Sequence, residues 1–252
     1  MTSVSTIGVL GGMGPEATNR LCALITALTP VAKDQDHIPV ITYNNSLIPD
    51  RVGAADGLSE SPLPEMVRTA RVLERAGAGL LVMPCNLAHL FIEELQREIQ
   101  IPILNMIEET TRFVIAQYPS LRRVGLLASA PTIRHRLYES SFDKHQRVVI
   151  VPEPAAQQAL VMEAIYGPRG IKRGHKDEPR ALLTEAAQQL LNKGAELIIA
   201  GCTEVSLVLG DGQAAFDVVD PLEAVARVAV ERARAGVGRK PQAGGSSQRM
   251  AL

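Results

Sequence analysis

The chain has 252 residues, which is enough for one large domain or two modest ones. Hydrophobic residues make up 46% and charged residues 21%, so we expect a packed core, and the scarcity of aromatic residues makes that core aliphatic. A net charge of −1, without a basic block or an acidic tail, argues against nucleic acid or a membrane surface as the partner. No apolar run has the length of a membrane span, and the first residues do not form a secretory signal, so we expect a cytoplasmic protein.

Short aliphatic runs alternate with helical patterns along the chain. The aliphatic runs, in chain order, fall at 7–13, 80–83, 101–106, 124–130, 197–200 and 215–220. The helical patterns fall at 17–28, 65–76, 107–118, 181–193 and 221–235. This alternation is typical of βαβ units, and it predicts an α/β fold with mainly parallel sheets flanked by helices.

Two parts of the chain are related by a constant offset of 117 residues. "GAGLLVMPCNL" (77–87) lines up without a gap with "GAELIIAGCTE" (194–204), and "IGVLGGM" (7–13) lands on "VGLLASA" (124–130). A period of this length is too long for a solenoid. We therefore predict two similar domains related by pseudo-two-fold symmetry. The end of the chain, 237–252, is rich in Gly, Ser and polar residues, and we expect it to be disordered.

Two of the three cysteines, Cys85 and Cys202, occupy equivalent places in this repeat. Parallel sheets bind ligands beyond the carboxyl ends of their strands, so we expect the two thiols to meet across one cleft. A thiolate on one face of a stereocentre and a thiol on the other can invert it by proton transfer. The helix predicted after each cysteine should lower the pKa of its thiol.

Two other interpretations of the cysteines were weighed. A cysteine at a strand end is often structural, although two at matched positions favour catalysis. Metal binding by Cys85 with His89 is disfavoured, because zinc sites favour close Cys and His spacing of the CxxC kind. We therefore expect no metal.

The segment "GGMGPEAT" (11–18) follows a predicted strand and opens a helix, with Pro15 near the first helical position. Exposed backbone N–H groups at such a helix start favour a carboxylate site. Dinucleotide binding is the alternative, but GxGxxG fits only with Ala17 in its last place, and no acidic residue marks a ribose site with confidence. A tight turn without ligand is the third interpretation.

Five segments together resemble the PLP-independent amino-acid racemases of the aspartate/glutamate racemase family, and within it the aspartate racemase branch. They run in family order over nearly the whole ordered chain: "IGVLGGMGPEAT", "YNNSLIPDR", "MPCNLAH", "IYGPRGIKRG" and "GCTE". The resemblance implies a homodimeric enzyme that interconverts L- and D-aspartate, with glutamate as the other candidate substrate. It implies two α/β domains with the active site in the cleft between them, and proton transfer by two cysteines with no cofactor. It also implies that the final helix returns to the first domain, which gives domains at 1–115 plus 213–236 and at 116–212.

By position, Cys85 and Cys202 match the catalytic pair of that family. The resemblance implies that Asn86 and Thr203, the polar residues beside them, hold the amino and carboxylate groups of the substrate.

The resemblance also assigns the cations and the backbone contacts. Arg51, in "IPDR", and Lys172, in "GIKRG", match the cations that aspartate racemases use on the substrate carboxylates. The planar fork of an arginine suits a carboxylate, and the glycines around Lys172 suit a lid over the cleft. Both residues could otherwise be solvated. Gly12 and Met13 match backbone contacts near the substrate.

One departure from the family puts the substrate in doubt. The family usually has "CNTAH", whereas this chain has "CNLAH", so Leu87 replaces a threonine whose hydroxyl helps to bind a substrate carboxylate. His89 could tune Cys85 or pack and cap a helix, and Glu204 could support Cys202 or cap its helix. Two other functions remain open. They are an isomerase or decarboxylase of the same scaffold, which normally keeps only one cysteine, and a non-catalytic small-ligand binding protein.

Overall fold

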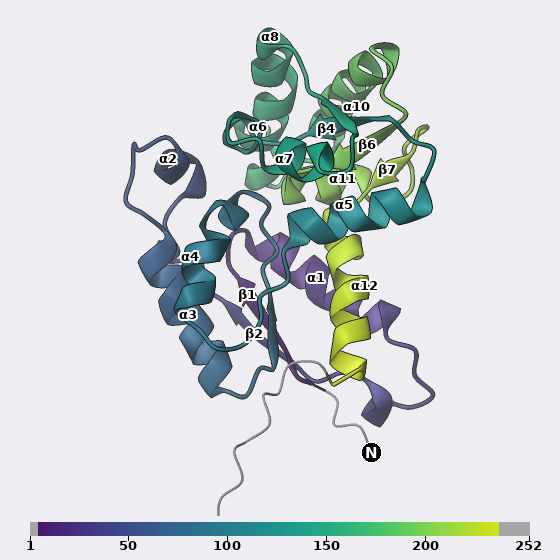
Figure 1. Ribbon diagram of the computed structural model, residues 1–252. Helices are drawn as coiled ribbons and strands as arrows, with labels where there is room; N and C mark the ends of the chain where they lie inside the picture. Colours follow the sequence, from purple (N-terminus) through teal and green to yellow (C-terminus); the bar gives the residue numbers. More distant parts are fainter. Residues whose placement is uncertain (1–4, 237–252) are drawn as a thin grey trace, which may run out of the picture.

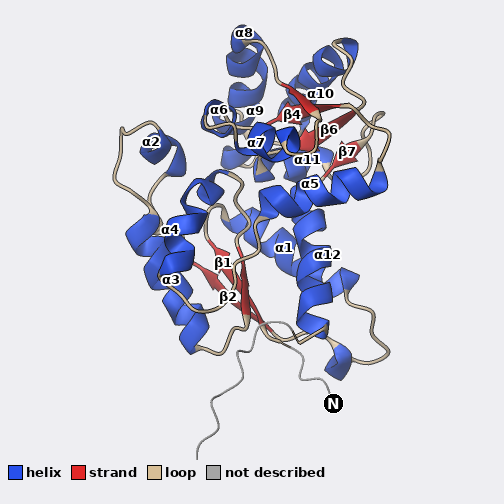
Figure 2. Cartoon of the chain, in the orientation of Figure 1, coloured by secondary structure: helices blue, strands red, loops and turns tan. Residues whose placement is uncertain are grey.

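The computed structural model, which describes residues 5–236, contains two separate parallel sheets (Figures 1 and 2). The first has the order β2-β1-β3, from strands β1 (Ile7–Gly11), β2 (Val40–Asn44) and β3 (Leu80–Val82). The second has the order β5-β4-β6-β7, from strands β4 (Arg123–Leu127), β5 (Val148–Ile150), β6 (Leu197–Ala200) and β7 (Val218–Val219). The expected disordered tail, 237–252, lies outside the described residues.

Helices surround both sheets (Figure 2). Those in the first half are α1 (Pro15–Leu28), η1 (Asp34–Asp36), α2 (Arg51–Ala55), α3 (Leu63–Arg75), η2 (Leu87–Phe91), α4 (Ile92–Arg97) and α5 (Met106–Gln117). Those in the second half are α6 (Ala130–Arg134), α7 (Leu137–Asp143), α8 (Pro154–Ala156), η3 (Gln157–Met162), α9 (Glu163–Tyr166), η4 (Ile171–Arg173), α10 (Asp177–Asn192), α11 (Thr203–Leu209) and α12 (Pro221–Arg234). None of the helices within 5–236 combines the length and the apolar character that crossing a membrane requires.

The repeat seen in the sequence is present in the backbone. Ile7 of β1 pairs with Leu80 of β3, and at the same offset Val124 of β4 pairs with Leu197 of β6. The helices before β3 and β6, α3 and α10, are each followed by a glycine with positive φ, +99° at Gly77 and +89° at Gly194, a conformation that glycine adopts without strain. Strands β1, β3 and β6 are buried along their whole length, and their sequences are therefore aliphatic runs without polar alternation. The predicted α/β fold with two similar domains is confirmed.

Each sheet and the helices packed on it form one half of the molecule, and two long helices link these halves (Figure 1). Helix α12 packs into the core around β1 and α1. Helix α5 shares a core with strand β4 of the second sheet and with helix α7. The two helices also pack against each other. Strand β7 pairs with β6, so this part of the segment 213–236 lies in the second sheet and not in the first. The domain boundaries at 115 and 212 stay a prediction, because the chain crosses between the halves at both helices.

Two predicted strands are shorter than the sequence indicated. The run 101–106 makes only an isolated bridge, between Ile103 and Leu81, and the run 215–220 keeps only the two residues of β7. Pro102 cannot donate a backbone hydrogen bond, although its carbonyl accepts from Leu81, which explains part of the weak pairing. The predicted helices correspond to α1, α3, α5, α10 and α12.

Candidate active site

The two equivalent cysteines lie just beyond the equivalent strands β3 and β6. Cys202 is the residue that precedes the first turn of α11, and Cys85 lies shortly before the short helix η2. Only 7% of the surface of Cys85 and 8% of that of Cys202 is exposed. Both residues line one pocket between the halves of the chain. The structure therefore brings together the two thiols that the sequence singled out.

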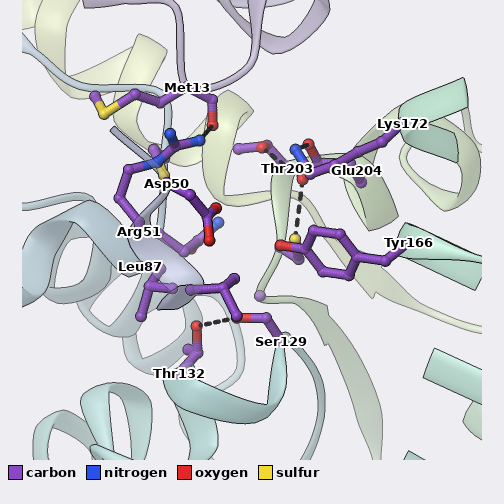
Figure 3. A pocket seen from close by; sticks show the side chains of 15 residues that line it. Met13, Asp50, Arg51, Leu87, Ser129, Thr132, Tyr166, Lys172, Thr203 and Glu204 are labelled. Carbon is purple, nitrogen blue, oxygen red and sulfur yellow. Dashed lines mark hydrogen bonds and ion pairs between the residues drawn. The ribbon is translucent and has the colours of Figure 1, made fainter. Parts of the chain in front are cut away.

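The pocket collects side chains from several elements of both halves (Figure 3). It is lined by Met13, Asp50, Arg51, Val52, Cys85, Asn86, Leu87, Ser129, Thr132, Tyr166, Lys172, Gly201, Cys202, Thr203 and Glu204. Its cavity of about 20 Å³ has room for about one water molecule. An amino acid is much larger, so its binding requires lining side chains, or the two halves, to move apart.

Glu204 is the centre of a buried polar group at the start of α11. The thiol of Cys202 donates to its Oε2 at 3.0 Å, and the hydroxyl of Thr203 donates to the same oxygen at 3.2 Å. The ammonium of Lys172, on η4, pairs with the other oxygen, Oε1. The side chain that was expected either to support Cys202 or to cap its helix thus supports Cys202 directly.

These contacts set the charge state of the site. Burial would raise the pKa of Glu204, but the Lys172 ammonium and the Cys202 thiol outweigh it, so the pKa is lowered and Glu204 is a carboxylate at neutral pH. Burial is the largest cause that raises the pKa of the Cys202 thiol well above its usual range, and the Glu204 charge adds to it. The backbone N–H of Glu204, in the first turn of α11, does lower this pKa, but burial and the Glu204 charge outweigh it, so the net lowering expected for Cys202 is not found. Burial lowers the pKa of Lys172, but the charge of Glu204 reverses the shift, so Lys172 stays charged.

Asn86 presents an unused hydrogen-bond donor. Its Oδ1 accepts from the hydroxyl of Tyr138 at 2.5 Å, while its Nδ2 is buried and has no protein partner. The residue lines the pocket beside Cys85. A buried donor without a partner costs free energy unless a ligand satisfies it, so this N–H group favours a ligand with an acceptor oxygen.

Leu87 lies on η2 and contributes an apolar wall to the pocket, with 5% of its surface exposed. The side chain at position 87 therefore offers no hydrogen bond to a ligand. Ser129 and Thr132, which are drawn lower in the view, have their hydroxyls 2.9 Å apart (Figure 3).

Arg51 lines the pocket, so it is not a solvated surface residue. Its Nη1 donates to the carbonyl of Pro49 at 3.0 Å, and its Nη2 donates to the carbonyl of Met13 at 3.0 Å. Its Nε is buried without a protein partner. Most of the guanidinium therefore holds backbone segments in place, and Nε and the second N–H of Nη2 are the donors left for a ligand.

The turn after β1 is shaped by Gly12. This residue has φ of +100°, and an added Cβ would lie 2.0 Å from the carbonyl oxygen of Asn45. Its N–H donates to the hydroxyl of Thr18 at 3.1 Å, so that group serves the turn itself. Gly12 does not line the pocket, whereas Met13 does. The carbonyl of Met13 accepts the hydrogen bond from Arg51.

His89 lies behind the pocket and connects two backbone segments. Its Nε2 accepts from the N–H of Met106 at 3.0 Å, so its Nδ1 carries the proton and donates to the carbonyl of Cys85 at 2.8 Å. Burial lowers its pKa, which keeps the ring neutral. His89 therefore caps the start of α5 and at the same time fixes the backbone of Cys85.

Sequence reasoning missed several residues of the pocket. Tyr166 lies within the segment "IYGPRGIKRG", and its ring centre is 5.5 Å from the Lys172 ammonium, yet nothing in the pattern marked it. Ser129 could have been found, because it lies at the repeat offset from Gly12. Tyr138, which lies behind the pocket and contacts Asn86, had no such signal. Within 5–236, no three His, Cys, Asp or Glu side chains gather into a group that could hold a metal ion.

The chain is similar to known racemases in sequence and in fold. The Asp/Glu/Hydantoin racemase family matches residues 10–229. A broad specificity amino-acid racemase of Bacillus subtilis, RacX, is 25% identical over 230 residues, covering 89% of this chain and 96% of that protein. An aspartate racemase from Picrophilus torridus has a similar structure, with a TM-score of 0.75 and 24% identity over 91% of this chain and 94% of that chain. A glutamate racemase from Francisella tularensis has a TM-score of 0.62 and 15% identity over 90% of this chain and 80% of that chain.

Proposed function

The chain belongs to the Asp/Glu/hydantoin racemase family, and on this basis we propose that it interconverts the L and D forms of aspartate by two-base proton transfer. The family assignment confirms the expected enzyme class. The proposal concerns the substrate, the two cysteines and the absence of a cofactor. One observation carries it: two thiols at equivalent strand ends of the repeat line the same pocket.

The two thiols can move a proton across a substrate held between them. A thiolate removes the α-hydrogen as a proton, and the electron pair stays on the α-carbon next to the carboxylate. The second thiol then delivers its own proton to the opposite face, which gives the other enantiomer. After this step the thiolate and the thiol have exchanged roles. In this form the site can take the other enantiomer, and exchange of the thiol protons with water restores the starting form for another turnover in the same sense. No redox partner is needed, because proton transfer alone balances the reaction.

The contacts of Cys202 indicate which thiol is protonated in the resting enzyme. Its hydrogen bond to the Glu204 carboxylate requires the S–H form, and the nearby negative charge opposes ionisation. In this resting form Cys202 is the thiol that can deliver a proton, so the role of the base falls to Cys85.

The unused donors in the pocket support an acidic substrate. Asn86 Nδ2 and Arg51 Nε are buried without protein partners, and both can donate to carboxylate oxygens. The side chain of Lys172 is 31% exposed and lines the pocket, so its ammonium, which pairs with Glu204, adds positive charge near a second carboxylate. Aspartate, which carries two carboxylates, is therefore the first substrate to test.

A second candidate is racemisation of a different amino acid by the same thiols. Leu87 makes one wall apolar, and the terminal nitrogens of Arg51 are already bound to carbonyls, so a second carboxylate has few donors. The similarity to a broad specificity racemase points the same way. A panel with glutamate and several neutral amino acids distinguishes this candidate from aspartate specificity.

Single cysteine variants test the mechanism. We expect Cys85→Ser and Cys202→Ser each to lower racemisation of aspartate by at least about 100-fold, the usual contribution of a general acid or base. Each variant should still exchange the α-hydrogen of one enantiomer with deuterated water, and the two variants should prefer opposite enantiomers. Proton NMR with each enantiomer measures both quantities.

Cys22→Ser is the matched control, because this third cysteine lies half-buried on α1 and does not line the pocket. Near-wild-type racemisation in either pocket variant would overturn the two-thiol mechanism. A protein that binds aspartate but neither racemises it nor exchanges its hydrogen would be a binding protein instead.

The homodimer and the cytoplasmic location stay predictions.

A further inference from the structure

Tyr138 connects the two halves directly behind the pocket. It lies on α7 of the second half and is completely buried, and its hydroxyl donates at 2.5 Å to Oδ1 of Asn86 in the first half. Burial raises the pKa of Tyr138, so its hydroxyl keeps the proton that this bond uses. The ring also reaches the other catalytic segment: a Cβ added to Gly201, the residue before Cys202, would lie 3.2 Å from its Cε2. One side chain thus contacts the segments beside both thiols.

The bond from Tyr138 determines which end of the Asn86 amide faces the pocket. A phenol hydroxyl that donates its proton must be matched by the carbonyl oxygen of the amide, not by the NH₂ group. The NH₂ group is then free, and it is the buried donor without a protein partner. If the hydroxyl were absent, the amide could rotate and present its oxygen to a substrate carboxylate, which would repel it.

We propose that Tyr138 is a positioning residue: it holds the Asn86 amide so that Nδ2 donates to a carboxylate of the substrate. The inference rests on the proposed function, since it assumes that a carboxylate occupies this pocket. It assigns a role to a residue that touches neither the reacting atoms nor the pocket surface. It also explains why a large polar side chain occupies a fully buried place between the halves, where an apolar ring would pack equally well.

Tyr138→Phe removes only the hydroxyl. Tyr118→Phe is the matched control, because this residue is half-buried and its hydroxyl forms no hydrogen bond with any residue within 5–236. We expect Tyr138→Phe to raise the KM for aspartate by about 10-fold or more, the range for a hydrogen bond to a charged group, while kcat changes much less. In an Asn86→Ala background, the same substitution should change KM by less than about 2-fold, because the amide that it positions is gone. A residue with only a structural role would lower thermal stability equally in both backgrounds without this selective effect on KM.

Binding is measured separately from racemisation, by the protection that aspartate and succinate give the pocket thiols against iodoacetamide. If the wild type binds both acids and racemises aspartate, but Tyr138→Phe matches it in KM and protection, the role of Tyr138 is refuted. The same holds if the effects of Tyr138→Phe and Asn86→Ala are additive. If neither acid protects the wild-type thiols, the carboxylate site itself fails, and the inference fails with it.

Discussion

Replacing Glu204 with glutamine should make Cys202 easier to ionise. The carboxylate accepts from the thiol at 3.0 Å and repels the thiolate, so it raises the pKa of Cys202. Two unit charges about 4 Å apart interact by about 4 kcal/mol at an effective dielectric constant of about 20. Even a third of this, about 1.4 kcal/mol, would increase the ratio of thiolate to thiol about 10-fold at a given pH. Glutamine keeps the shape but removes the charge, and the ammonium of Lys172 then stabilises the thiolate without competition.

Two assays measure this change. The first is the pH profile of kcat/KM, which must be equal for the two enantiomers because their equilibrium constant is one. Its alkaline limb, where Cys202 loses its proton, should move to lower pH in Glu204→Gln. The second is the pH dependence of Cys202 alkylation by iodoacetamide in a Cys85→Ser background, which does not require racemisation. It should move in the same direction.

Lys172→Met provides the control of opposite sign. Removing the ammonium leaves the Glu204 carboxylate unopposed, so the pKa of Cys202 should rise and the alkaline limb should move to higher pH. The electrostatic account is refuted if Glu204→Gln leaves both pH profiles unchanged. It is also refuted if the two substitutions shift the profiles in the same direction, because then the charge of the residue is not what sets the ionisation of Cys202.

Two further substitutions test the substrate wall and the turn. Leu87→Thr restores the hydroxyl usual in the family, and it should lower the KM for aspartate relative to that for neutral amino acids. A steady-state comparison of both substrate types checks this, and an unchanged ratio would show that Leu87 does not select the substrate. Gly12→Ala should destabilise the protein by at least about 2 kcal/mol, because φ is +100° and the new Cβ would lie 2.0 Å from the carbonyl oxygen of Asn45. Urea denaturation measures this against Gly57→Ala, where φ is +70° and nothing lies within 4 Å, and equal losses at both positions would refute the clash.

The local elements and the pairing of the halves could be predicted from the sequence. Aliphatic runs and helical periods specify strands and helices over short distances, and the constant offset between Cys85 and Cys202 predicted equivalent strand ends. Parallel sheets place such ends at one edge, so two similar halves facing each other bring both thiols to one pocket. The resemblance to known racemases placed Arg51 and Lys172 near the substrate, and both line the pocket in the structure.

The charge state of the site was decided only by the tertiary structure. The helix after Cys202 suggested a lowered pKa, but burial and the Glu204 carboxylate reverse the shift, and neither effect follows from local periodicity. The same applies to contacts between distant segments: Lys172 meets Glu204 across 32 residues, and Tyr138 meets Asn86 across 52 residues. The physical reason is that backbone periodicity depends on neighbouring residues, whereas desolvation and hydrogen-bond partners depend on how deeply the folded chain buries each group and on which segments it brings together.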